Sequence, residues 1–195
     1  VKIQTSDKVY GTGIIHEFNE REYTVFELMV IMLIQSDNTA ANKIIDIVGM
    51  EQINEDIIAM GLKNTRLNRK TNDERTAITD VENITTAYDL SKIWKHLANG
   101  TFLSKDNGQM LIDILRRQQI KNKLALYIPD DLKIEISSKT GDKKGVENDT
   151  EYLELPKGKF TFTVLSEGIP NSVYGTVSLA KCGKMMWDEV MNNWN

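Results

Sequence analysis

The sequence predicts an α+β fold: a helical region, then antiparallel strands, then a C-terminal helix packed on the sheet. Three observations support this order. Apolar residues recur at helical spacing up to Leu115, alternate with polar residues beyond Pro129, and return to helical spacing from Ser172. Because consecutive strands joined by short turns pair antiparallel, we expect the strands to form one sheet.

The composition narrows the function classes. The 195 residues can build one domain with a sizeable core, and 27% charged residues are ordinary for a soluble protein. A net charge of -4 gives no basic field for nucleic acid or anionic membrane. One cysteine, Cys182, and two distant histidines, His16 and His96, predict no metal site, and we expect no cofactor. No apolar run approaches the roughly 20 residues of a membrane span.

The first expected helix is strongly apolar. Thr24 can cap it, and it should run to Gln35 as a helix inside a core, because residues 28–34 are all apolar. Ser36-Asp37-Asn38 follows. The next helix should end at Gly49, a natural stop, and another short helix should come after it.

The segment from Lys63 to Asn83 has no apolar periodicity. An irregular span of this length is more often functional than incidental. Thr86 and Asp89 have the spacing of a capping box that opens a helix, and Ser104 can cap the next one.

The strands and the closing helix come last. Alternation predicts strands over Lys133–Ser138, Thr150–Leu155 and Phe160–Val164, the last two joined by a Pro-Lys-Gly-Lys turn. The helix from Ser172 should place Trp187 in the core.

Two tripeptides stand out: Ser36-Asp37-Asn38 after the apolar helix, and Lys139-Thr140-Gly141 after the first expected strand. Each alone is a weak signal, but both in this order arise by chance roughly once in a thousand chains of this size. With an upstream Ser-x-x-Lys, they mark class A β-lactamases and penicillin-binding proteins.

Over essentially all 195 residues the chain resembles a serine β-lactamase of class A, within the penicillin-binding, D,D-peptidase-like superfamily. Residues 36–42 read SDNTAAN, close to the family's usual wording. Further matches are Gly11-Thr12-Gly13 ahead of the helix, Arg66-Leu67-x-Arg69 at the start of the Ω loop, Thr85-Thr86 after it, and Asn148-Asp149.

The resemblance implies acyl transfer, with Ser36 and Lys139 as the catalytic residues of this chain. A hydroxyl both donates and accepts, so Ser36 can relay a proton to the leaving nitrogen. Lys139 would hold that hydroxyl and attract the substrate carboxylate. Two non-catalytic alternatives remain open: Ser36 could cap the following helix, and Lys139 could be a solvated strand lysine.

The implied substrate-binding residues are Asn38, Ser138, Thr140, Gly141 and Asp142. Asn38 offers its amide to a substrate carbonyl, although it too could merely cap the helix. Thr140 and Ser138 can bind a carboxylate or lie along the strand. The backbone N–H of Asp142 would serve as oxyanion donor, and Gly141 would permit the close approach. Asp37 is expected to hold the turn through backbone hydrogen bonds.

The family's Ser-x-x-Lys does not occur ahead of Ser36, and the match at Ser178 to Lys181 is expected by chance. We therefore expect 1–195 to be a single β-lactamase-like domain without the family's N-terminal strands and nucleophile helix, and the nucleophile to lie upstream of Val1. An upstream segment, a separate chain or a second copy should then cover the sheet edge.

The loop also departs from the family. In an ungapped alignment the family's deacylating Glu falls on Thr71, its following Asn on Arg75 and its closing acid on Ile84, while Glu74 is displaced by three residues. A general base must lie within hydrogen-bond reach of its water, so we expect slow deacylation.

The resemblance implies a bacterial β-lactamase-like serine hydrolase, extracellular or in the cell envelope and related to antibiotic-resistance enzymes. Its expected substrate is a small β-lactam or a cell-wall peptide with a D-Ala-D-Ala-type amide. Two alternatives stay open: a penicillin-binding or D,D-peptidase-like protein with slow deacylation, and a non-catalytic sensor that only binds β-lactam or peptidoglycan.

Overall fold

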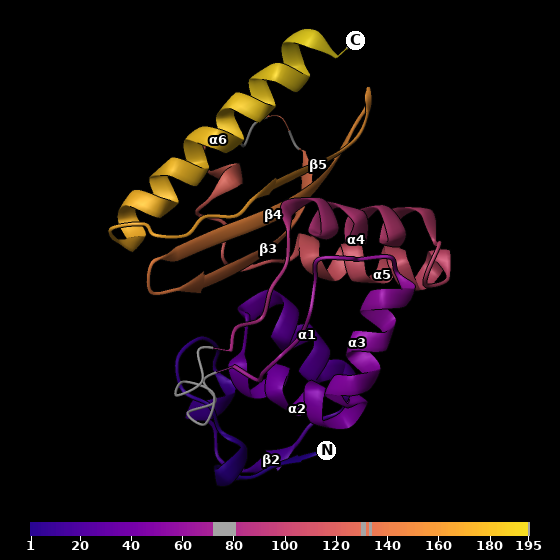
Figure 1. Ribbon diagram of the computed structural model, residues 1–195, viewed down its shortest axis with the longest axis vertical. Coiled ribbons are helices and arrows are strands. Elements are labelled where there is room, and N and C mark those ends of the chain that lie inside the picture. The colour runs from indigo at the N-terminus through magenta and orange to yellow at the C-terminus, as the bar shows by residue number, and fades with distance from the viewer. Residues whose placement is uncertain (72–80, 130–131, 133, 195) are drawn as a thin grey trace. The chain divides into compact units, whose positions relative to one another are not determined.

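The computed structural model describes residues 1–71, 81–129, 132 and 134–194. Two compact units make up the chain, Val1–Asp89 and Leu90–Asn195, and each is described by itself (Figure 1). The expected organisation as one domain stays a prediction. The α+β order of helices, antiparallel strands and a closing helix is confirmed.

The first unit is mainly helical. Two short strands, β1 and β2, pair antiparallel ahead of the helices, and the buried core combines Ile3, Ile15, Tyr23, Leu28 and Ala40. Its elements are β1 (Lys2–Ile3), η1 (Thr5–Asp7), η2 (Ile15–Glu17), β2 (Arg21–Glu22), α1 (Val25–Gln35), α2 (Asn38–Val48), α3 (Met50–Ala59) and the start of α4 (Ala87–Asn99).

Helix α1 begins and ends where the sequence predicts. The Thr24 hydroxyl accepts from the Glu27 N–H at 3.1 Å, and the Glu27 carboxylate accepts from the Thr24 N–H at 2.6 Å, which completes a capping box. Its burial is less complete than predicted. Leu28 is fully buried, but residues 29–34 are only partly buried, so an apolar helix surface stays open.

The expected capping box at the start of α4 forms only in part. The Asp89 N–H donates to the Thr86 hydroxyl at 3.2 Å. The Asp89 carboxylate is buried and accepts instead from the Asn64 N–H at 2.8 Å and the Thr65 hydroxyl at 2.9 Å. Asp89 therefore ties the start of the irregular segment to the helix.

The second unit holds a three-stranded antiparallel sheet in the order β3-β4-β5. Its elements are the rest of α4, α5 (Lys105–Arg116), η3 (Leu124–Tyr127), β3 (Glu135–Lys143), β4 (Val146–Leu155), β5 (Gly158–Val164) and α6 (Ser172–Asn193). Ser104 caps α5 as predicted, accepting from the Asn107 N–H at 3.3 Å.

The first strand differs from its prediction. It begins at Glu135 and continues through Lys139-Thr140-Gly141 to Lys143, whereas the predicted start, Lys133, lies outside the described residues. Cross-strand pairing explains the extension, since every residue from Glu135 to Lys143 has a partner on β4 and Gly145 makes the turn with φ +78°.

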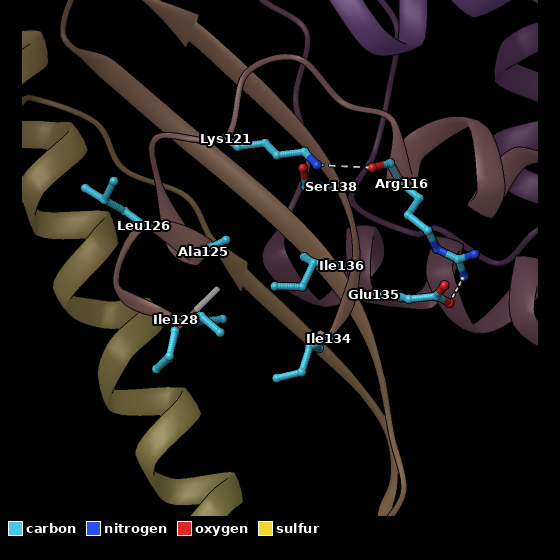
Figure 2. A pocket seen from close by; sticks show the side chains of 10 residues that line it. Arg116, Lys121, Ala125, Leu126, Ile128, Ile134, Glu135, Ile136 and Ser138 are labelled. Carbon is cyan, nitrogen blue, oxygen red and sulfur yellow. Dashed lines mark hydrogen bonds and ion pairs between the residues drawn. The ribbon is translucent and has the colours of Figure 1, made fainter. Parts of the chain in front are cut away.

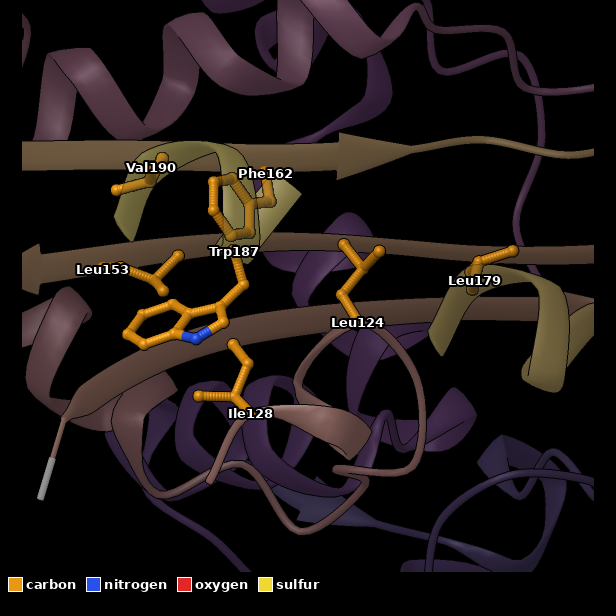
Figure 3. Close-up of a cluster of buried hydrophobic side chains, with 7 residues drawn as sticks. All are labelled: Leu124, Ile128, Leu153, Phe162, Leu179, Trp187 and Val190. Carbon is orange, nitrogen blue, oxygen red and sulfur yellow. The ribbon is translucent and has the colours of Figure 1, made fainter. Parts of the chain in front are cut away.

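The two faces of this sheet are covered by different helices (Figure 1). On one face α6 and η3 pack against β4, and Figure 3 shows the resulting core: Leu124, Ile128, Leu153, Phe162, Leu179, Trp187 and Val190. On the other face the Trp94 indole of α4 stacks on Tyr152 and donates to the Thr150 hydroxyl at 2.8 Å. The predicted burial of Trp187 is confirmed.

Gly183→Ala is expected to destabilise the protein by about 1–3 kcal/mol. A Cβ at Gly183 of α6 would lie 2.0 Å from the Leu124 carbonyl oxygen, so α6 or η3 must move. Urea unfolding measures the loss. Lys181→Ala, at an exposed position of the same helix, is the control and should stay within about 0.5 kcal/mol of wild type. Equal stability of G183A and wild type would contradict the close packing.

Candidate active site

The Ser-Asp-Asn turn of the first unit is built around Asp37. This residue is fully buried and is the N-cap of α2: its Oδ1 accepts from the Ala40 N–H at 2.8 Å. Its Oδ2 accepts from the Ile14 and Ile15 N–H groups at 2.7 and 2.8 Å. The predicted structural role of Asp37 is confirmed, and the alternative that Ser36 or Asn38 is the cap is wrong.

Ser36 and Asn38 occupy distinct positions on either side of that cap. Ser36 ends α1 in the left-handed conformation with φ +53°, the one non-glycine residue with positive φ among those described. Asn38 is the first residue of α2. Its backbone N–H donates to the Thr12 carbonyl at 3.0 Å and its side-chain amide to the Tyr10 carbonyl at 3.2 Å.

The Gly-Thr-Gly segment fits closely around this turn. Gly13 has φ +111°, and a Cβ there would lie 2.5 Å from the Asp37 Cα. Only glycine permits both the conformation and the approach. The segment thus fixes the turn through backbone contacts.

In the second unit, the Lys-Thr-Gly motif lies within β3. The Lys139 ammonium donates to the Thr140 carbonyl at 2.7 Å. Burial lowers the pKa of Lys139 to about 8, while the negative charge of Asp149 acts in the opposite direction. The side chain is partly buried on the strand, and the catalytic role of Lys139 stays a prediction.

The residues next to Lys139 on β3 differ in their contacts. Ser138 is buried, and its carbonyl accepts from the Gln118 amide at 3.3 Å. The buried Thr140 hydroxyl has no hydrogen-bond partner among the described residues. A Cβ at Gly141 would meet only Asn148, at 3.9 Å, so packing inside this unit does not require glycine there.

Strand β4 places three carboxyl groups on the face shared with Ser138, Thr140 and Asp142. The register pairs Ser138 with Glu151, Thr140 with Asp149, and Asp142 with Glu147. Sequence reasoning missed this acidic face. The signal was present, because acids at every second position of a strand point to one side.

Asp149 and Glu151 form a buried carboxyl pair. Burial raises the pKa of Asp149 to about 7, although the Leu124 N–H, which donates to it at 3.2 Å, acts in the opposite direction. Burial, and then the charge of Asp149, raise the pKa of Glu151 well above its usual range. Asp149 Oδ1 and Glu151 Oε2 are buried without a donor among the described residues, so a shared proton would satisfy both.

This pair makes stability depend on pH. A carboxyl whose pKa is raised in the fold stabilises the protein below its unfolded pKa of about 4, and that contribution is lost as pH rises through the folded pKa. Asp149→Asn removes one titration. We expect the stability of the variant relative to wild type to increase by on the order of 2 kcal/mol between pH 5 and pH 8.

Urea unfolding of both proteins across this pH range tests the expectation. Glu167→Gln, at an exposed carboxyl of the same unit, is the matched control and should leave the pH dependence unchanged. If the free energies of unfolding of Asp149→Asn and wild type change with pH in the same way, the predicted titration of Asp149 is contradicted.

Thr71, which aligns with the family's deacylating Glu, is hydrogen-bonded to Asn42. The Asn42 side-chain oxygen accepts from both the N–H and the hydroxyl of Thr71, at 2.9 and 3.0 Å, and its amide donates to the Thr71 carbonyl at 3.0 Å. Sequence reasoning did not single out Asn42, although it lies one helical turn after Asn38 on the same face of α2. Glu74 and Arg75 lie outside the described residues.

The arginines of this segment act as anchors. Arg69 forms an ion pair with Glu82 at 2.8 Å, and the Arg66 backbone pairs with Ile84 at 2.9 and 3.1 Å. Both contacts close the loop at its base.

A pocket of about 490 Å³ borders the N-terminal half of β3 (Figure 2). Ile134 and Ile136 contribute to its apolar lining, and Arg116 and Glu135, which form an ion pair at 3.1 Å, also line it. The lining includes Ser138 but none of Lys139 to Asp142, so this pocket adjoins the motif strand without containing its motif.

No helix in the described part of the chain is long and apolar enough to cross a membrane. Likewise, His, Cys, Asp and Glu side chains of the described residues form no group of three or more that could hold a metal ion.

An α+β fold with Ser-Asp-Asn at a helix junction and Lys-Thr-Gly on a strand defines the serine β-lactamase and penicillin-binding class. The family model described as "Beta-lactamase enzyme family" matches residues 1–190. The chain belongs to this family. A search of curated proteins found no match.

Solved structures give the same fold. A β-lactamase from Sphaerobacter thermophilus is 27% identical with a TM-score of 0.91, over 98% of this chain and 73% of that one. A PBP-A variant, solved as an acyl-enzyme complex with penicillin G, is 24% identical with a TM-score of 0.83, over 98% of this chain and 71% of that one. A class A β-lactamase from Bacteroides cellulosilyticus is 19% identical with a TM-score of 0.84, over 97% and 73%.

Proposed function

We propose that the protein is a β-lactamase-like serine hydrolase that acts on β-lactams or D-Ala-D-Ala-type amides through an acyl-enzyme. The observation that carries the proposal is the role of Asp37. Because Asp37 caps α2 and accepts from the Ile14 and Ile15 N–H groups, neither Ser36 nor Asn38 is needed as the cap. The Ser36 hydroxyl and the Asn38 amide, which also donates to the Tyr10 carbonyl at 3.2 Å, are therefore assigned to chemistry on a substrate.

The proposed reaction breaks the amide C–N bond. A serine upstream of Val1 attacks the carbonyl carbon, and the backbone N–H of Asp142 donates to the developing oxyanion. The proton that the attacking serine loses is relayed through the Ser36 hydroxyl to the leaving nitrogen. Water then hydrolyses the acyl ester and releases the serine.

The remaining residues orient the substrate. Lys139, with a pKa lowered to about 8, attracts the substrate carboxylate when it is protonated. Thr140 offers a buried hydroxyl that lacks a partner among the described residues. In this proposal the Asn38 amide donates to a substrate carbonyl, and Ser138 binds the substrate carboxylate. Gly141 lets the substrate approach the strand.

A second candidate, a penicillin-binding or D,D-peptidase-like protein with slow deacylation, rests on Thr71. A threonine hydroxyl is not a base at neutral pH, and here it donates to Asn42 at 3.0 Å. Water beside it would lack the carboxylate that deacylation needs. The two candidates share acylation and differ in the lifetime of the adduct.

The setting we propose is the bacterial exterior or cell envelope, where cell-wall peptides and β-lactams occur. Strand β5 ends the described sheet, and α1 has a partly open apolar surface. A segment of the same chain, a separate chain or a second copy would cover such surfaces.

Full-length protein incubated with penicillin G and examined by mass spectrometry tests the function. We expect a covalent adduct, and Ser36→Ala and Lys139→Met should each slow its formation by about 100-fold or more. The absence of any adduct, despite an upstream Ser-x-x-Lys, would overturn the proposal. Reversible binding without an adduct would favour the non-catalytic sensor.

A further inference from the structure

Lys123 is a buried lysine that no motif explains. It directly precedes η3 and is only 2% exposed. Its ammonium forms an ion pair with Glu147 at 2.6 Å, contacts the Asp142 carboxylate, and donates to the Asn148 carbonyl at 3.2 Å. A buried charge of this kind is expensive unless it is fully partnered, and Lys123 has several partners.

The position of these partners shows why a cation is needed. Asp142 and Glu147 are directly opposite in the register of β3 and β4, so their side chains share one face of the hairpin. Like charges at opposed positions destabilise an antiparallel pair. The Lys123 ammonium bonds to both carboxylates and converts the repulsion into attraction.

The two carboxylates are not equally fixed. The Glu147 carboxylate also accepts from the Ser172 hydroxyl at the start of α6, and its Cγ lies where a Cβ on Gly175 would be only 2.6 Å away. The Asp142 side chain is 41% exposed. Lys123 therefore links the more exposed partner, Asp142, to one that α6 holds.

Apolar packing does not replace this link. Asp142 and Glu147 line a pocket of about 550 Å³ between the hairpin and the start of α6. The Asp142 side chain is thus held by charge pairing, in addition to the pairing of its backbone with Glu147 on β4.

We propose that Lys123 is a positioning residue: by bridging Asp142 to Glu147 it holds the backbone N–H of Asp142 where acyl transfer needs its oxyanion donor. The inference rests on the proposed function, in which that N–H stabilises the transition state. Lys123 acts through Asp142, and its ammonium is committed to protein carboxylates.

The test measures acylation of the full-length protein by a fluorescent penicillin over a range of concentrations, which separates the acylation rate constant from the binding constant. Losing one oxyanion donor costs about 100- to 1000-fold, so a displaced donor in Lys123→Met should cost about 10- to 100-fold in rate. We expect the binding constant to change less than about threefold.

Two further variants isolate the cause. Lys123→Arg keeps the positive charge and should retain the rate within about threefold. Lys123→Met with Glu147→Gln removes the cation and one repelling carboxylate together, so it should recover at least about tenfold over Lys123→Met. Lys121→Met, an exposed lysine nearby, is the control for charge loss and should match wild type.

The outcomes separate the two levels of the argument. Absence of an adduct in wild type overturns the proposed function, and the inference with it. With wild type active, an unchanged rate in Lys123→Met overturns the inference alone. So does a weakened binding constant that Glu147→Gln does not restore, since Lys123 would then bind the substrate carboxylate itself. If Lys123→Met does not fold, the comparison of Lys123→Arg with the double variant decides: a double variant within about tenfold of Lys123→Arg supports charge balance at the hairpin as what positions Asp142, and a slower one overturns the inference.

Discussion

Thr71→Glu in the full-length protein is expected to shorten the lifetime of the penicillin adduct by about 10- to 100-fold. A positioned general base contributes about 100- to 10,000-fold, and the lower value allows for a loop not shaped around a carboxylate. The backbone of Thr71 is already fixed by Asn42, whose oxygen and amide bond its N–H and carbonyl at 2.9 and 3.0 Å. The new carboxylate would therefore start from a fixed backbone position.

Release of the acyl group after rapid removal of free penicillin measures this lifetime. Thr71→Gln is the matched control, because it has the same size as Glu but no basic oxygen, and it should leave the lifetime near wild type. The acylation rate should change little in both variants. Equal lifetimes for Glu and Gln would show that position 71 does not place a base near the ester.

Asp37→Ala is expected to destabilise the protein by about 3–5 kcal/mol, the range for a broken buried charge network. The substitution leaves the N–H groups of Ala40, Ile14 and Ile15 without their acceptor, and each such buried donor costs about 1–3 kcal/mol. Because the same carboxylate fixes the turn, residual folded protein should also acylate slowly.

Chemical denaturation of the full-length variant measures the loss. Asp46→Ala is the matched control on the same helix α2: its carboxylate forms an ion pair with Lys70 but is 49% exposed, so the change should stay within about 1 kcal/mol. An Asp37→Ala variant as stable as Asp46→Ala would contradict the role of Asp37 as the centre of the turn.

The secondary structure could be predicted where local pattern and packing agree. Helix α1 follows from its apolar run and from Thr24, and α6 follows from the spacing that buries Trp187. The strand through Lys139-Thr140-Gly141 was predicted too short, because lysine and glycine interrupt the alternation. Pairing with β4 overrides that local signal.

The candidate site could be predicted only where its residues lie in contiguous motifs. Ser36 and Asn38 lie in the Ser-Asp-Asn motif, and Lys139 lies in the Lys-Thr-Gly motif. Lys123 contacts Asp142 and Glu147, which are far along the chain, so no local pattern marks it. Its importance becomes visible only when the hairpin register is known.

The left-handed conformation of Ser36 has an evolutionary consequence. Helices that end in this conformation generally use glycine, because a side chain there costs about 1 kcal/mol or more. In a library screened only for folding, Ser36→Gly should therefore be enriched. In the same library screened for acylation, glycine should disappear from this position. Glycine enriched at position 36 by the folding screen and depleted by the acylation screen would show that the Ser36 hydroxyl is retained for chemistry although its backbone conformation is strained.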